Sequence, residues 1–231
     1  MGQSMTTLVE RPGNPRLSDS LIASWRRVPA AVAADQLGVR AHADPAIRPL
    51  APLGHGVRLI GSAVTAWCDP AFDLGAVLHA IDVAEAGDVI VIAADGRSDA
   101  AMIGELLSTA ARHKGIAGVI ADSAVRDSAN LAEWQDFIVF ARSITPRGPT
   151  SLSGGIVNRT VDFAGVTISP HDLVIGDNDG VVIVPHGLAE SRLAACLARV
   201  DVEDGWQEAL AGGRSLLEVF NVPAARVARA P

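Results

Sequence analysis

The stretch DVIVIAADGRSDAAMIGELLSTAARHKGIAGVIAD, residues 88–122, decides the fold of this chain. Its first eight residues form a nearly continuous apolar run, which is typical of a strand covered on both faces. Apolar residues then recur at i, i+3, i+4 and i+7 from Ile103, the stripe of an amphipathic helix, and Gly115 ends that helix. A second apolar run follows at residues 118–122. This order predicts a parallel βαβ unit with a right-handed crossover.

Further helices and strands are predicted on both sides of this unit. Helical periodicity runs over residues 18–37, with Ser18 or Asp19 as the N-cap and Pro29 as an interruption. Residues 56–68 are rich in β-branched side chains and predict a strand pair or one bent strand. The other expected elements are a helix over 73–85, strands over 136–142, 161–169, 172–177 and 180–185, a helix over 188–210 and a short helix from Ser215.

Turn residues set the limits of these later elements. The sequence Asn178-Asp179-Gly180 marks a tight turn between two strands, and Gly212 and Gly213 end the long helix. We therefore expect one α/β domain over residues 18–231, with a helical extension from about 187 to 231. Residues 1–17 are polar and rich in Pro and Gly, which predicts a flexible arm.

The composition excludes several classes of protein. Of the 231 residues 49% are hydrophobic and 19% charged, so we expect a packed core. No run of 18 apolar residues and no apolar signal segment occurs, so we expect a cytoplasmic protein that does not enter a membrane. A formal net charge of −7 argues against a nucleic-acid partner, which would require a basic patch.

The sequence contains no zinc motif, and its single lysine argues against Schiff-base chemistry. Cys68 and Cys196 lie far apart and are expected to be buried thiols, and the six histidines show no zinc-type spacing. Of the 19 lysine and arginine residues only Lys114 is a lysine, and it lies in a polar stretch typical of a helix end. An aldolase with this composition would therefore use a metal ion rather than a Schiff base.

Candidate site residues gather at one edge of the predicted βαβ unit, because ligands bind at the carboxyl ends of parallel strands. GELL, residues 104–107, lies near the start of the crossover helix, where free N–H groups bind anions and Gly104 allows a close approach. Arg126 and Asp127 follow the next strand. Arg126 can hold a carboxylate bidentately, and a Mg²⁺ ion on Asp127 could polarise a 2-oxo group.

A purely structural interpretation of these residues remains open at this point. An adjacent Arg and Asp in a loop often form a surface ion pair, and GELL is ordinary helix sequence. Only their common position at one strand edge favours a functional site.

The longer run of residues 87–127 resembles the signature region of the RraA-like proteins. The similarity continues through FARSITPRG at 140–148 and GDNDGVVIVP at 176–185, and it covers about residues 18–212. This family includes 4-hydroxy-4-methyl-2-oxoglutarate and 4-carboxy-4-hydroxy-2-oxoadipate aldolases. The resemblance implies a swivelling β/β/α sandwich with helical N- and C-terminal extensions, assembled as a homotrimer or homohexamer with sites between subunits.

The resemblance also implies roles for individual residues. The backbone amides of Leu106 and Leu107 would bind the pyruvate carboxylate and the neighbouring oxygen, beside Gly104 and Glu105. Arg126 would contact the substrate and the enolate oxygens.

The metal site implied by the resemblance is shared between subunits. Asp127 would ligate Mg²⁺, or alternatively Mn²⁺ or Co²⁺, and Glu105 would bind a water on the metal. Glu203 from the C-terminal helix of a neighbouring subunit would complete the site through a water, with Asp204 and Glu208 as alternatives.

The resemblance thus predicts a metal-dependent class II pyruvate aldolase that cleaves a 4-hydroxy-2-oxo acid and also decarboxylates oxaloacetate. Two features depart from the family pattern: DGRSD at 95–99 replaces a glycine-rich loop, and the chain has no tyrosine to act as an acid. The alternative is a non-catalytic regulator that binds an RNA-degrading enzyme. A methyltransferase is disfavoured, because no glycine-rich turn of GxGxG type for a nucleotide-like cofactor is present.

Overall fold

The computed structural model describes residues 6–38, 40–68 and 74–226, and its centre is a parallel sheet. Strands β3 (Leu59–Trp67), β4 (Val89–Ala101), β5 (Gly118–Val125) and β6 (Ile138–Ile144) lie side by side in that order, each parallel to the next. The side chains of β3 and β5 are almost all buried, as are residues 89–94 of β4 and 138–141 of β6, in agreement with the predicted apolar runs. Short edge strands complete the sheet: β2 (Arg48–Pro49) beside β6, and β7 (Ile156–Val157) and β1 (Leu8–Val9) beyond β3.

Residues 59–67 form one strand, β3, that belongs to two sheets, so of the two predicted alternatives the structure has a single strand rather than a strand pair. Its second half pairs with β4, while residues 59–62 pair with β10 (Leu173–Asp177) in antiparallel register. A tight turn at Asn178 and Asp179 joins β10 to β11 (Gly180–Val184), as predicted. The predicted strand over 161–169 is instead a hairpin of β8 (Val161–Phe163) and β9 (Val166–Ile168), because the chain reverses at Ala164 and Gly165.

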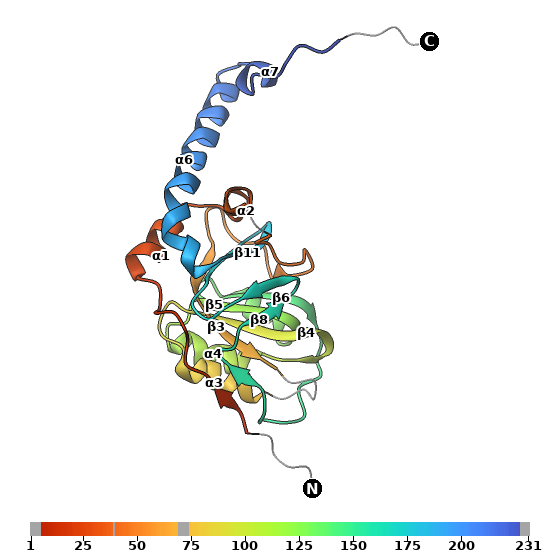
Figure 1. The fold of residues 1–231 in the computed structure, drawn as a ribbon. Coiled ribbons are helices and arrows are strands. Elements are labelled where there is room, and N and C mark those ends of the chain that lie inside the picture. The colour runs from red at the N-terminus through yellow and green to blue at the C-terminus, as the bar shows by residue number, and fades with distance from the viewer. Residues whose placement is uncertain (1–5, 39, 69–73, 227–231) are drawn as a thin grey trace.

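Helices cover the face of the central sheet that is opposite the β8–β9 hairpin, which gives a β/β/α arrangement (Figure 1). Helices α3 (Gly75–Val83) and α4 (Glu105–His113) pack on this face through a cluster that includes Ile90, Ile92 and Val119. A separate apolar cluster that includes Val91, Phe140 and Phe163 fills the space between the central sheet and the β8–β9 hairpin. The short helix α5 (Ser128–Ala132) follows β5.

The expected helical extensions are present at both ends. Helices α1 (Asp19–Trp25) and α2 (Ala30–Leu37) are separated near Pro29, and the side chain of Ser18 caps α1. They pack with the first half of α6 (His186–Ala211), whose second half projects away from the body (Figure 1). Helix α7 (Leu216–Val219) follows. Within the described residues no helix combines the length and the apolar character needed to cross a membrane.

Two segments differ from the prediction. Strand β4 continues to Ala101 through two register shifts, although the polar residues 95–99 suggested a loop; these side chains are largely exposed, so the strand pairs without burying them. The described part of the predicted flexible arm makes defined contacts. Residues 8–9 pair with β7, and the guanidinium of Arg16 donates a 2.7 Å hydrogen bond to the buried carboxylate of Asp88.

Candidate functional site

The end of β5 and the start of α4 meet at the carboxyl edge of the sheet. The backbone N–H of Arg126 donates to the carbonyl of Ile103 at 3.1 Å, and that of Met102 donates to Ala124 at 2.9 Å. These bonds hold the residues before α4 against the residues after β5. The common strand edge expected from the βαβ topology therefore exists, and it brings GELL to Arg126 and Asp127.

Asp127 has an unusual backbone conformation that turns its side chain towards α4. Its φ and ψ of 56° and 32° lie in the left-handed region, which aspartate tolerates better than most residues. Its Oδ2 accepts a 2.9 Å hydrogen bond from the N–H of Glu105, the first residue of α4. The carboxylate thus lies at the positive end of a helix dipole, yet its side chain remains 41% exposed and accessible to a ligand.

Gly104 leaves the space that this arrangement needs. Its backbone is extended, with φ −151°, a conformation open to any residue. A Cβ atom on Gly104, however, would lie 2.6 Å from Oδ2 of Asp127 and 2.7 Å from Cγ of Arg126. The glycine therefore permits the close approach of two side chains of the site, whereas the sequence suggested only the approach of a ligand.

The guanidinium of Arg126 lies close to two glycines and remains accessible. A Cβ on Gly148 would lie 2.7 Å from its Nη1, and a Cβ on Gly104 would lie 3.0 Å from its Nε. Its Nε is 3.6 Å from Oδ2 of Asp127, and its side chain is 45% exposed. Such a loose, exposed ion pair contributes little stability. Within residues 6–38, 40–68 and 74–226 no carbonyl or carboxylate accepts a hydrogen bond from this guanidinium, so its planar fork is free to bind an anion.

Glu105 is held by a residue that the sequence did not single out. Its Oε2 accepts a 2.8 Å hydrogen bond from the side-chain amide of Asn130 in α5. The only signal for Asn130 was its position three residues after Asp127, which places both near the start of one helix. The amide fixes the carboxylate of Glu105, the residue whose backbone N–H donates to Asp127.

The first turn of α4 presents free backbone donors. The N–H groups of Leu106 and Leu107 have no acceptor among the described residues, as expected in the first turn of a helix. The side chain of Leu106 is 79% exposed, whereas Leu107 packs against the core. Both residues, with Gly104 and Arg126, line a cleft of about 300 Å³.

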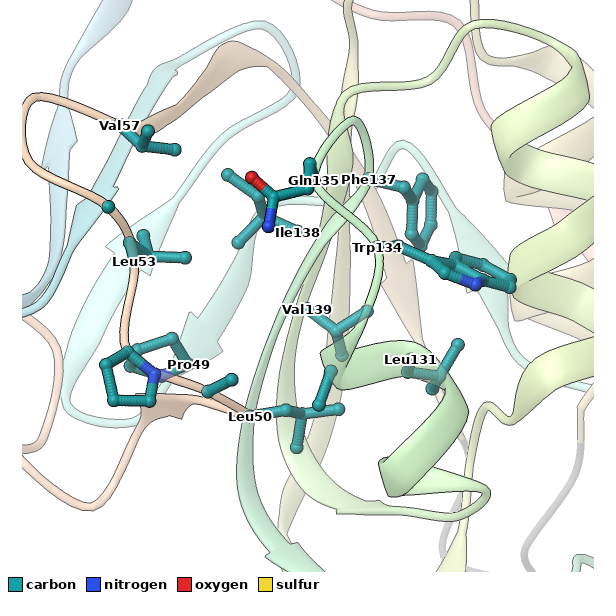
Figure 2. Close-up of a pocket in the computed structure, with 14 residues that line it drawn as sticks. Pro49, Leu50, Leu53, Val57, Leu131, Trp134, Gln135, Phe137, Ile138 and Val139 are labelled. Carbon is teal, nitrogen blue, oxygen red and sulfur yellow. The ribbon is translucent and has the colours of Figure 1, made fainter.

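Another cavity, of about 50 Å³, lies between the loop after β2 and the segment around Trp134 (Figure 2). Figure 2 shows aliphatic and aromatic side chains around it, among them Leu53, Leu131 and Phe137. None of the predicted site residues lines this cavity. The cleft beside α4 is therefore the better candidate for a substrate site.

The acidic residues fit a hydrated hard cation better than an enclosed metal site. In the part of the chain that the structure describes, no three His, Cys, Asp or Glu side chains are grouped to hold a metal. Asp127 and Glu105 offer carboxylate oxygens only, and Asp127 is half exposed with no described donor to its Oδ1. Few carboxylates with room for water suit Mg²⁺.

The remaining predicted ligand lies elsewhere in the chain. Glu203 belongs to the projecting half of α6, and its carboxylate accepts a 2.8 Å hydrogen bond from Nε of Arg199. The alternatives Asp204 and Glu208 also belong to α6. The structure of one chain therefore does not bring any of these three to Asp127.

Lys114 lies at the opposite end of α4 from this site. It is the C-cap residue of that helix, and its Nζ donates to the carbonyls of Ile81 and Asp82 at the end of α3. It lies nine positions after Glu105, a rise of about 13 Å along the helix. Its position agrees with the helix end predicted from the sequence.

The sequence of this chain is similar to one family model and to a named relative. The sequence model of the RraA-like family, described as Aldolase/RraA, matches residues 15–183. A protein of Halalkalibacterium halodurans with the provisional name 4-hydroxy-4-methyl-2-oxoglutarate aldolase is 33% identical over 172 residues, which are 74% of this chain and 80% of the relative.

Two crystal structures share the fold. An uncharacterized protein from Pseudomonas syringae pv. tomato has a TM-score of 0.77 at 26% identity, with 90% of this chain and 100% of that chain covered. Streptomyces coelicolor RraAS2, described as an unusual member of the RNase ES inhibitor RraA family, has a TM-score of 0.72 at 23% identity, with 84% and 98% covered.

Proposed function

Because the chain belongs to the RraA-like family, we propose that it is a divalent-metal-dependent lyase that releases pyruvate from a 4-hydroxy-2-oxo acid by retro-aldol cleavage. The observation that carries this proposal is the convergence of three groups at one edge of the sheet. These are the accessible guanidinium of Arg126, the free N–H groups at the start of α4, and the carboxylate of Asp127. Together they suit a small anionic substrate that develops further negative charge.

The binding roles follow from the charges of these groups. The N–H groups of Leu106 and Leu107 and the guanidinium of Arg126 would hold the carboxylate and 2-oxo end of the substrate. Arg126 would also face the charge that develops on the 2-oxo oxygen as the C3–C4 bond breaks. Oxaloacetate decarboxylation leaves the same pyruvate enolate, so we propose that one site performs both reactions.

Asp127 would hold a divalent cation, Mg²⁺ in the first place, with Mn²⁺ or Co²⁺ as substitutes. When bound, such an ion supplies Lewis-acid polarisation of the 2-oxo group. Glu105, fixed by Asn130, would orient water beside Asp127. Because the described residues offer few protein ligands, most of the coordination shell would be water.

We further propose that the protein is a homotrimer or homohexamer whose sites are completed by α6 of a neighbour, through Glu203. The projecting end of the chain supports this, because it exposes large apolar side chains that a second copy would cover. They are Val202, Leu210, Leu216, Leu217, Phe220 and Val222. Sedimentation should give a trimer or larger, and Glu203→Gln should reduce activity. A fully active monomer would contradict the shared site.

The decisive experiment measures pyruvate release. Purified protein is incubated with Mg²⁺, Mn²⁺ or Co²⁺ and with several 4-hydroxy-2-oxo acids or oxaloacetate. We expect metal-dependent pyruvate formation from at least one 4-hydroxy-2-oxo acid. Turnover that is unchanged in excess chelator would reject the metal, and no pyruvate from any substrate would reject the lyase.

A second candidate is a regulator of an RNA-degrading enzyme. The observation in its favour is the coverage of 98% of the chain of RraAS2, whose description places it in a family of RNase inhibitors. The retained Asp127 and the cleft favour the lyase instead. Inhibition of an RNase E-type enzyme by both the wild type and Asp127→Asn, without pyruvate release, would support the regulator.

A further inference from the structure

The cleft beside α4 has two chemically different parts. One part consists of Arg126, Gly104, Leu106 and Leu107, which belong to the proposed binding site. The other is an aliphatic wall from α3, the end of β4 and the loop after β6. Its residues are Leu74, Leu78, Ala101, Met102, Ile103, Pro149 and Leu152. The cleft therefore connects an anion-binding end to an apolar end.

The wall is fixed by backbone hydrogen bonds. The N–H of Leu74 donates to the carbonyl of Ser151 at 3.1 Å, which ties the loop carrying Leu152 to the start of α3. The N–H of Ala101 donates to Arg147 at 2.8 Å, which ties the residues before Pro149 to the end of β4. The wall is also continuous with the protein core, since Leu74 and Met102 belong to the main apolar cluster.

The distribution of charge restricts what the apolar end can accept. Among the described residues that line the cleft, Arg126 alone carries a charge. Under the proposed function, this guanidinium and the N–H groups of Leu106 and Leu107 bind the carboxylate and 2-oxo end. No cation that this chain supplies to the lining then remains for a second carboxylate on the substrate, and Glu203, the residue proposed from the neighbour, is an acid.

We infer that the cleft receives the C4 substituent of the substrate and that this substituent is apolar. The preferred substrate would be a 4-hydroxy-2-oxo acid with a single carboxylate and an alkyl or aryl group on C4. This inference rests on the proposed function. In the reaction the 4-hydroxyl loses its proton and becomes the carbonyl of an apolar aldehyde or ketone. The electrons of the C3–C4 bond pass to C3, which takes up a proton to give pyruvate.

The physical basis is the difference in desolvation between a methyl group and a carboxylate. An ion moved from water into an apolar cleft without a partner loses its hydration, whereas an alkyl group gains contact with the wall. A single methylene in an apolar pocket changes kcat/KM by about 10–200-fold. We therefore expect discrimination of at least about tenfold between the two substituents.

A matched pair of substrates tests this directly. 4-Hydroxy-2-oxopentanoate carries a methyl group on C4, and 4-hydroxy-2-oxoglutarate carries a carboxylate at the same position. For the wild type with Mg²⁺ we expect kcat/KM for the methyl substrate to be about tenfold higher or more. 4-Hydroxy-2-oxohexanoate, with one further methylene, should be better still.

The variant Leu152→Arg tests whether the lining of the cleft causes the preference for the methyl substrate. Leu152 is 73% exposed, so the substitution leaves the core intact. A new cation in the apolar part of the cleft should shift the ratio of kcat/KM values towards 4-hydroxy-2-oxoglutarate by about tenfold or more, which corresponds to one charge-assisted hydrogen bond. Val83→Arg is the matched control, because Val83 is an exposed apolar residue at the far end of α3. It should leave the ratio unchanged.

The outcomes separate this inference from the proposed function. Pyruvate release with a wild-type preference for the dicarboxylate would overturn the inference and leave the lyase in place. An equal change in the ratio of the two kcat/KM values in Leu152→Arg and in Val83→Arg would also overturn the inference. No pyruvate from any substrate would reject the lyase and, with it, the inference. A preference for the methyl substrate that Leu152→Arg alone reverses would establish it.

Discussion

The backbone N–H of Glu105 donates a 2.9 Å hydrogen bond to Oδ2 of Asp127, which joins the start of α4 to the residue two positions after β5. Asp127 adopts a left-handed conformation, and its side chain reaches back to the helix. The carboxylate therefore lies between a helix N-terminus and the guanidinium of Arg126. Both positive groups attract the carboxylate and keep it in place.

The variant Asp127→Asn should abolish metal-dependent activity and leave the fold intact. Asparagine also tolerates the left-handed region and can accept the N–H of Glu105, but a neutral amide is a poor ligand for Mg²⁺. Pyruvate release should fall to background, and excess chelator should have the same effect on the wild type. Asp136→Asn is the control, because Asp136 is an exposed acid paired with Arg112. Normal turnover in Asp127→Asn would remove the metal from the mechanism.

Gly104→Ala should damage the site more than the fold. The added methyl would lie 2.6 Å from Oδ2 of Asp127, so either the carboxylate or the start of α4 must move. A displacement of about 1 Å typically costs on the order of 10² in rate, and overpacking costs about 1–3 kcal/mol. Gly187→Ala, at a position in α6 with open space around it, should keep full activity and lose no stability. Activity and unfolding measurements on both variants would show whether the space at Gly104 matters.

The sequence predicted the parallel strands and the edge at which the site lies, because apolar periodicity reports burial and βαβ topology brings strand ends together. The limits of the strands were less predictable. The polar residues 95–99 contain an Asp and a Gly with positive φ and suggested a loop, yet the chain pairs with β5 again at Arg97 and at Ala101, each after a register shift. Pairing needs no apolar side chain, so no periodicity could reveal it.

Three details of the site also could not be predicted from the sequence. The left-handed backbone at Asp127 and the hydrogen bond from Asn130 to Glu105 depend on how α5 turns away from the sheet. The apolar wall combines Leu78 and Leu152, which are far apart in the chain. Such contacts follow from tertiary packing rather than from any local pattern.

Lys114→Ala should lose stability while keeping activity. The ammonium group donates to carbonyls at the C-terminus of α3, where a cation is favoured, so its loss should cost about 1–2 kcal/mol. The site is about 13 Å away along α4, so kcat/KM should stay near the wild-type value. Lys114→Arg should recover part of the stability. Covalent trapping of pyruvate on Lys114 by borohydride would reveal Schiff-base chemistry instead.

The buried Asp172 should make stability depend on pH. Burial is the main cause that raises the pKa of this carboxyl above 3.8, although it accepts hydrogen bonds from the N–H groups of Ser169 and His186. Because the pKa is raised in the folded state, the contribution of this carboxyl to the free energy of unfolding is complete below the unfolded pKa. That contribution is lost as the pH rises through the folded pKa. Asp172→Asn should therefore lose less stability than the wild type as the pH rises above about 4, the usual pKa of an aspartate. Asp162→Asn, an exposed acid on β8, should follow the wild type; an identical pH slope in Asp172→Asn would contradict the assignment.

Variants of Arg126 distinguish two roles for this residue. It is either a partner in a surface ion pair or a group that stabilises the charge developing in the reaction. If it only pairs with Asp127 at 3.6 Å, Arg126→Ala should cost about 0–1 kcal/mol and leave turnover unchanged. If it holds the substrate and faces the developing enolate, its removal should lower kcat/KM by about 10²–10³-fold.

The two glycines beside its guanidinium and its place in the cleft favour the second outcome. Aldol cleavage and oxaloacetate decarboxylation should fall together, because both pass through the pyruvate enolate. Arg126→Lys should rescue only part of the rate, because an ammonium lacks the planar fork. Arg112→Ala, which breaks the partly exposed pair with Asp136, controls for the loss of a surface cation. Kinetics for both reactions and melting temperatures should be measured on all three variants, and wild-type rates in a folded Arg126→Ala protein would remove the centre of the proposed site.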